Sequence, residues 1–201
     1  MNTSSLHHAR NSSRHVAGRA LSDADVTAYA LAAGSGLPGA VEEFVRATRR
    51  DVWCFVAHLS DRQSADDLTQ ETFLRAWTAL PRFTGGSSAR TWLLSIARRV
   101  VVDRHRAASC RPRTADLDDW REQAERRQDR GLPGFDEGVA LAELQRMLEP
   151  SRREAFVLTQ VVGLGYAETA ELIGCPIGTV RSRVARARGD LAALLRASEP
   201  A

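Results

Sequence analysis

The stretch Tyr166–Arg188, YAETAELIGCPIGTVRSRVARAR, predicts two helices joined by a tight turn. Gly174 suits the left-handed residue that ends the first helix, and Pro176 suits the first turn of the second, where its missing N–H costs nothing. Apolar residues then recur at helical spacing and form one narrow stripe: Ile177, Val180, Val184, Ala187 and Leu191. Small, polar or basic residues lie away from the stripe or flank it: Thr179, Arg181, Ser182, Arg183, Ala185, Arg186 and Arg188. This pattern is typical of a helix-turn-helix that reads DNA.

A plain amphipathic surface helix is the alternative interpretation of this segment, because arginines on a helix are usually just solvated. Here the arginines at 181, 183, 186 and 188 are accompanied by a single acid, Asp190. Arginine is also the better bidentate partner for phosphate and guanine. We therefore favour the DNA-reading interpretation.

The composition limits the classes of protein to consider. A chain of 201 residues suits one or two domains, and 43% hydrophobic residues suffice for packed cores. All 28 basic residues are arginine, yet the net charge is only +3, so the basicity of the second helix is local. The three cysteines are far apart and form no CxxC, which argues against a disulfide framework or a zinc site and suits a reducing cytosol. No apolar run approaches the roughly 18 residues of a membrane span.

The fold class predicted from the pattern is all-α. Residues 22–33 and 41–59 have helical periodicity, with Ser22 as the N-cap of the first helix. No segment alternates long enough to predict a strand. Residues 1–20 contain histidines, serines and arginines without the apolar core of a secretory signal, so we expect a disordered tail there.

The helix predicted over residues 65–80, ADDLTQETFLRAWTAL, has an unusual outer face. That face carries Asp66, Asp67, Gln70, Leu74 and Trp77, with Glu71 at its margin. A leucine and a tryptophan within an acidic surround are typical of a protein interface. The alternative is that both contact another helix of the same domain. Neighbouring carboxylates without a histidine do not favour catalysis or metal binding.

A second hydroxyl-and-arginine face is predicted on the helix over residues 91–107, which follows the loop PRFTGGSSA at 81–89. Opposite its buried stripe lie Thr91, Ser95, Arg98, Arg99, Val102 and Arg106. Two such faces, far apart in sequence, suggest two separate contacts on nucleic acid.

Residues 109–135 are charged, mixed in sign and poor in apolar residues, which predicts a linker. Two further helices are expected over 136–148 and 151–162, separated by Pro150. Ser151 would cap the second, with Glu154 completing a capping box.

These segments together resemble the bacterial RNA polymerase sigma factors. DDLTQETFLRAW, residues 66–77, is similar to their core-polymerase-binding segment. FTGGSSARTWLLSIARRVVVDRHR, residues 83–106, is similar to the segment that melts the promoter and reads its −10 element. Residues 153–188 are similar to the domain that reads the −35 element. The length matches the extracytoplasmic-function type, with the actinobacterial sigma-C-like branch nearest.

The resemblance implies partners and site residues. The partners would be core RNA polymerase, double-stranded promoter DNA and the melted −10 strand, with no membrane and no cofactor; whether an anti-sigma protein also binds is left open. The resemblance implies that Asp67, Gln70, Glu71 and Trp77 bind polymerase, and the helical-face pattern adds Asp66 and Leu74. It implies a −10 site at Phe83, Ser87, Ser88, Arg98 and Arg99, and the face pattern adds Thr91, Ser95 and Arg106. It implies −35 contacts by Arg181, Ser182, Ala185 and Arg186, and the face pattern adds Thr179, Arg183 and Arg188.

We therefore expect a cytoplasmic, two-domain helical sigma factor that performs no covalent chemistry. Its parts would be a tail at 1–20, a polymerase- and −10-binding domain at 21–108, a linker at 109–135 and a −35-binding domain at 136–197. An ordinary repressor or activator with the same helix-turn-helix is one rival; it predicts a homodimer and a palindromic site. A nuclease or other phosphate-handling enzyme is another, but it lacks a clustered carboxylate–histidine site.

Overall fold

The computed structural model describes residues 21–110 and 144–198, and within these ranges the backbone forms helices and loops without any strand. The all-α prediction is therefore confirmed. The elements are α1 Asp23–Gly34, α2 Ala40–Leu59, α3 Ala65–Ala79, the 3₁₀ turn η1 Leu80–Arg82, α4 Ala89–Cys110, α7 Pro150–Phe156, the π-helical η2 Val157–Val161, α8 Tyr166–Ile173 and α9 Ile177–Ser198.

Local chemistry explains several of the helix ends. Ser22 caps α1: its hydroxyl accepts from the Asp25 N–H at 3.2 Å, and the Asp25 carboxylate accepts from the Ser22 N–H at 3.0 Å. Gly174 ends α8 in the left-handed region, with φ at 70°. The Cys175 N–H bonds to the Ala170 carbonyl and the Gly174 N–H to the Glu171 carbonyl, which together form a Schellman motif.

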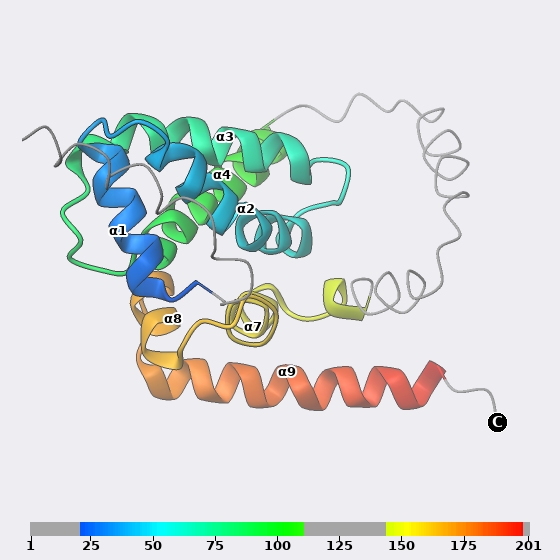
Figure 1. Cartoon of the computed structure of the whole chain (residues 1–201). Helices are drawn as coiled ribbons and strands as arrows, with labels where there is room; N and C mark the ends of the chain where they lie inside the picture. Colours follow the sequence, from blue (N-terminus) through cyan, green and yellow to red (C-terminus); the bar gives the residue numbers. More distant parts are fainter. Residues whose placement is uncertain (1–20, 111–143, 199–201) are drawn as a thin grey trace, which may run out of the picture.

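Helices α1–α4 form a bundle whose core is built from large side chains, among them Phe44, Phe55, Leu93 and Leu94, each at most 1% exposed. Leu94 lies about 100° around the helix from Leu93, yet it is buried as deeply as Leu93. Figure 1 shows why a second face of α4 is covered: α7 and α8 lie between this bundle and α9.

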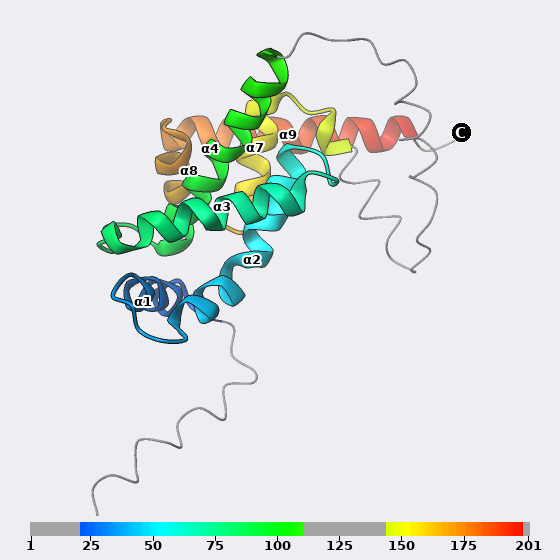
Figure 2. The same ribbon diagram turned by 90° about the horizontal axis from the view of Figure 1, so that it is seen from above.

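The two halves of the chain share one hydrophobic core. Val157, Leu158, Val162 and Leu164 belong to the same buried cluster as the side chains of α1–α4. The π-helical turn, in which the Val162 N–H bonds to the Val157 carbonyl at 2.9 Å, places this apolar segment against α2. Figure 2 shows α7 and α8 beside α4 from a second direction. The halves are therefore packed together rather than merely tethered.

The apolar stripe of α9 is buried against α7 and α8, except at its first residue. Val180 and Val184 pack with Ala155 and Ala170, and Leu191 packs with Leu148 and Ala187. Ile177 remains 39% exposed. Pro176 precedes α9, where its carbonyl accepts from the N–H groups of Thr179 and Val180.

Two sequence predictions in this region are wrong. Residues 109–110, predicted as linker, continue α4 to Cys110. Ser151 does not cap α7: the Glu149 carboxylate accepts from the N–H groups of Ser151 and Arg152, and Glu154 bonds elsewhere. The predicted tail at 1–20, residues 111–135 of the linker and residues 136–143 of the next helix lie outside the described residues.

Candidate protein and nucleic-acid interfaces

The outer face of α3 is exposed and carries large apolar side chains. Leu74 is 58% and Trp77 60% exposed, while Asp66, Asp67 and Gln70 are also exposed. Because so much of both apolar side chains is in solvent, the alternative that they are covered by a neighbouring helix of the domain does not hold within the described residues. An exposed tryptophan ringed by polar groups is the pattern of an interface anchor.

Several charged groups of α3 are held by intramolecular contacts. Arg75 donates to Glu71 at 2.7 Å and to Asp103 at 2.6 Å, and these two hydrogen bonds raise the pKa of the Arg75 guanidinium. Asp66 accepts from the indole N–H of Trp53 at 3.1 Å. Asp67 and Gln70 are thus the polar residues of the face that are most available to a partner, whereas the Glu71 carboxylate is paired with Arg75.

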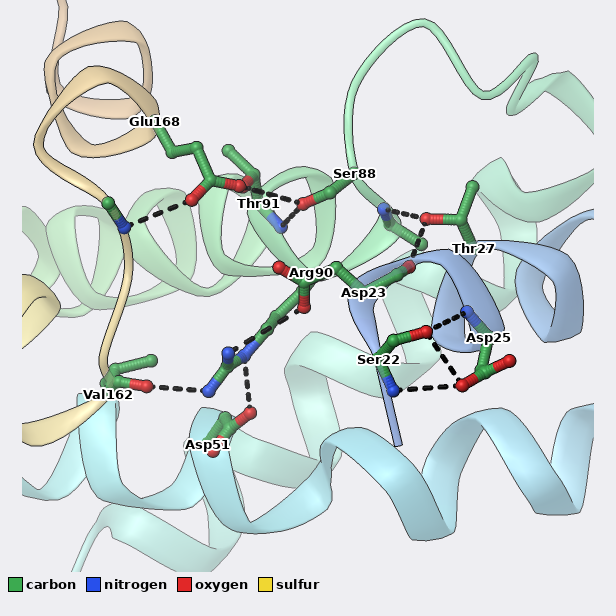
Figure 3. A network of polar contacts seen from close by, with 12 residues as sticks. Ser22, Asp23, Asp25, Thr27, Asp51, Ser88, Arg90, Thr91, Val162 and Glu168 are labelled. Atoms are coloured by element: carbon green, nitrogen blue, oxygen red, sulfur yellow. Dashed lines mark hydrogen bonds and ion pairs between the residues drawn. The ribbon is translucent and has the colours of Figure 1, made fainter. Parts of the chain in front are cut away.

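The face of α4 proposed for the −10 element is partly covered by the second half of the chain. Glu168, on α8, accepts hydrogen bonds from the hydroxyls of Ser88 at 3.4 Å and Thr91 at 3.2 Å through Oε1, as Figure 3 shows. Its other oxygen accepts from the Gly165 N–H at 3.0 Å. Thr91, expected on an outward face, is only 5% exposed. The sequence prediction of an open Thr91 is wrong for this reason.

Arg98 and Arg90 extend this contact. The Nε of Arg98 donates to Glu154 on α7 at 2.6 Å. Arg90 donates to the Val162 carbonyl at 2.6 Å and to Asp51 at 2.7 Å, and lies 3.7 Å from Asp23 (Figure 3). Arg90 therefore joins α1, α2, α4 and the segment after η2 through one side chain.

The other proposed −10 residues differ in accessibility. Phe83 packs on Trp92 with ring centroids 4.8 Å apart, and Ser95 donates to the Trp92 carbonyl at 2.6 Å. Ser87 is half-buried, while Arg99 and Arg106 are exposed. Only part of the proposed −10 set thus faces solvent in this arrangement.

The outward face of α9 is open. The exposed residues are Arg181, Ser182, Ala185, Arg186 and Arg188. Thr179 and Arg183 are half-buried. Arg183 lies with Nη1 3.8 Å from the Cys175 sulfur, and Arg188 donates to Gln160 at 2.6 Å, so both lean away from the centre of the face. Arg186 and Ser182 remain at that centre.

Comparisons with known proteins assign the two halves of the chain to two different conserved regions. A model of sigma-70 region 2 matches residues 44–110, and a model of sigma-70 region 4 matches residues 139–191. The chain is 53% identical over 178 residues to the ECF RNA polymerase sigma factor SigC of Mycobacterium tuberculosis (strain CDC 1551 / Oshkosh), a match covering 89% of this chain and 94% of that protein. The chain belongs to the extracytoplasmic-function sigma factors.

Two solved structures are similar to this sigma factor. CnrH, in complex with the cytosolic domain of CnrY, is 26% identical with a TM-score of 0.68, and the match covers 87% of this chain and all of CnrH. RpoE of Bartonella quintana, in complex with the anti-sigma factor NepR, is 27% identical with a TM-score of 0.61, covering 79% of this chain and 98% of RpoE.

Within the sigma factor, region 2 comprises α2–α4 and thus both the α3 face and the α4 face, whereas region 4 comprises α7–α9. Glu154, Glu168 and Arg90 connect the two regions, and the sequence pattern predicts this role for none of the three. Acid side chains spaced along a helix carry no local signal of a partner located 56 or 77 residues away. No group of three metal-ligating side chains occurs among residues 21–110 and 144–198, and no helix there could cross a membrane.

Proposed function

We propose that this sigma factor holds core RNA polymerase through the α3 face, reads the −10 element through the α4 face and reads the −35 element through α9. The observation that carries the proposal is the 60% exposed Trp77 on an acidic helix within region 2. The alternative of an ordinary repressor or activator leaves the exposed face at Leu74 and Trp77 unexplained. The protein would act in the cytoplasm, where the polymerase and the chromosome are, and would perform no covalent chemistry.

The assignment of roles follows from chemistry. Arg181, Ser182 and Arg186 present hydrogen-bond donors on an open helix, which suits base edges in a major groove. The α4 face combines hydroxyls with Arg98 and Arg99 near the Phe83–Trp92 pair, and aromatic rings beside arginines suit an unstacked strand. The bundle that contains α4 lies on one side of α7 and α8, and helix α9 lies on the other (Figure 1).

The experiment is in-vitro transcription. The purified chain is mixed with core polymerase and a library of promoter fragments, and the transcript starts are sequenced. The proposal requires specific starts that depend on the chain. A protein that binds DNA as a homodimer on palindromic sites, without giving polymerase-dependent starts, would instead be a repressor or activator.

A further inference from the structure

One stripe of α1 contacts the segment that leads from η1 to the start of α4. Thr27, Leu31 and Gly34 are four and three residues apart, so they lie along one side of the helix. They contact the segment 80–89 in reverse order: Thr27 meets Ala89, Leu31 meets Gly85, and Gly34 meets Leu80. The stripe therefore contacts the end, the middle and the start of this segment.

Thr27 supplies a hydrogen bond that the first turn of α4 cannot supply for itself. The first N–H groups of a helix have no partner within that helix, and Ala89 is 0% exposed, so water cannot reach its N–H. The nearby Ser88 hydroxyl accepts from the Thr91 N–H at 3.1 Å. The Thr27 hydroxyl donates to the Asp23 carbonyl at 2.7 Å and accepts from the Ala89 N–H at 3.0 Å (Figure 3). The end of the segment is thus held to α1 by one side-chain hydroxyl.

Leu31 supports the turn in the middle of the segment. Gly85 has a φ of 77°, a left-handed conformation that favours glycine. A Cβ at Gly85 would lie 3.5 Å from a methyl carbon of Leu31 and 4.0 Å from the Thr27 methyl, so the turn rests on both side chains. Leu31 is nevertheless 39% exposed, whereas Val26 and Ala30 lie in the bundle core. The stripe is thus separate from the face that α1 packs into the bundle.

Gly34 lets the start of the segment pass close to α1. An added Cβ at Gly34 would lie 2.6 Å from the Leu80 carbonyl oxygen, which is closer than Cβ atoms approach in proteins. The same carbonyl accepts from the Phe83 N–H at 3.0 Å. A side chain at Gly34 would therefore displace the turn that leads into Phe83, and with it the ring that packs on Trp92.

The loop at residues 83–88 needs such support. It contains two adjacent glycines and carries Phe83, Ser87 and Ser88 of the proposed −10 set. Glycines give a loop many accessible conformations, and a binding-competent shape that is only partly populated lowers the apparent affinity for a ligand. Contacts at both ends and in the middle hold one shape before DNA arrives, which reduces the cost of binding. The model of region 2 matches residues 44–110, so α1 lies outside the part of the chain that it covers.

We propose that α1 positions the loop 83–88 for one base of the −10 element, with Thr27, Leu31 and Gly34 as positioning residues that act through the loop. The proposal rests on the proposed function, because it requires that this loop binds the −10 strand. A binding site discriminates well only when its groups are held in place by supporting contacts. Loss of an α1 contact should therefore reduce the preference for the favoured base. The −35 and polymerase contacts should not change, because they are assigned to α9 and α3.

The test is in-vitro transcription by core polymerase with the full chain, on a promoter library randomised at both elements and barcoded in the transcribed region. Sequenced transcripts then give the −10 and the −35 preference from one reaction. The variants are T27V, which removes the hydroxyl at similar volume, T27S, which retains it, and L31A. L37A is the matched control, because Leu37 is a 59% exposed leucine just beyond α1, whereas Leu31 lies against Gly85.

We expect T27V to lower the preference for the favoured −10 base by roughly tenfold, the scale of leaving a buried N–H without a partner. L31A should lower it in the same direction by a smaller factor. T27S and L37A should stay within about twofold of wild type. The −35 preference, and the affinity for core polymerase measured by titration, should be the same for all four variants.

The outcomes separate this proposal from the proposed function. If the wild-type chain shows no preference at the −10 element, the proposed function itself fails. If the wild type discriminates and both T27V and L31A discriminate equally well, α1 does not position the loop, and the proposed function stands. A joint loss of −10 and −35 preference in T27V, with a lowered unfolding temperature, would mark a general loss of fold. L31A, which changes an exposed side chain, then decides: an unchanged −10 preference for L31A overturns the proposal.

Discussion

Arg98 on α4 and Glu154 on α7 form a two-pronged contact between regions 2 and 4, with Nε to Oε1 at 2.6 Å and Nη2 to Oε2 at 3.4 Å. Glu168 makes the matching contact to Ser88 and Thr91. In both places a carboxylate accepts from groups proposed to hold a negatively charged strand. If these groups hold the −10 strand as proposed, the bound strand would compete with the packed arrangement for the same donors.

The first prediction concerns this competition. E154Q/E168Q removes both charges while keeping the side-chain shapes, which weakens the contact between the regions because charged hydrogen bonds are stronger than neutral ones. The variant should bind a single-stranded −10 oligonucleotide roughly tenfold more tightly than wild type, since less binding energy is spent on separating the regions. Fluorescence anisotropy measures the affinity, and small-angle scattering should show a larger radius of gyration.

E171Q is the matched control for this pair of substitutions. Glu171 lies on α8 about one turn from Glu168 and is exposed, and its carboxylate has no hydrogen bond or ion pair with the described residues of α4. It should behave like wild type in both measurements. Equal affinity of E154Q/E168Q and wild type for the strand would show that the packing of the regions does not limit −10 binding.

The second prediction concerns the α3 anchor. Replacing Trp77 with Ala should weaken binding to core polymerase by roughly 2 kcal/mol, the scale of an interface hot spot. Because the side chain is 60% exposed, helical content and unfolding temperature should remain near wild type. A titration that gives the wild-type affinity for the variant would remove Trp77 from the interface.

The third prediction separates base contacts from phosphate contacts on α9. Arg186→Ala should cost about 1–3 kcal/mol and relax the preference at one base of the −35 element. Arg183 and Arg188 lean toward Cys175 and Gln160. Their loss should therefore weaken binding to all DNA sequences alike, and each should reduce the slope of log affinity against log salt concentration by about one unit. A randomised −35 library checks this; a changed base preference for Arg183→Ala alone would reverse the assignment.

The fourth prediction concerns the cap of α7 and pH. Hydrogen bonds from the Ser151 hydroxyl and the Ser151 and Arg152 N–H groups hold the pKa of Glu149 below its usual 4.5. A lowered folded-state pKa means that the charge stabilises the fold above the unfolded-state pKa, and that this contribution is lost as pH falls through the folded-state value. E149Q should therefore unfold at a lower temperature than wild type at pH 7, and the difference should narrow below pH 4.5. A difference that is the same at all pH values would assign the effect to shape rather than charge.

The sequence by itself determined the features that depend on near neighbours along the chain. Gly174 must end α8 because the left-handed conformation favours a residue without Cβ, and Val180, Val184 and Leu191 form one stripe because the helix repeats every 3.6 residues. The same periodicity placed Leu74 and Trp77 away from the bundle core, and both are exposed. Such short-range rules identified the helices and the candidate faces.

Only the tertiary structure decided what covers each face. Thr91 and Arg98 have the periodicity of solvent-facing residues, yet Glu168 and Glu154 from the other half of the chain bind them. Leu93 and Leu94 are adjacent along the chain and yet both are buried, because α4 contacts α8 as well as its own bundle. Asp66 accepts from the indole N–H of Trp53 only when α3 packs beside α2. These relationships join residues distant along the chain, and since no local spacing encodes such pairings, they arise only when the helices pack.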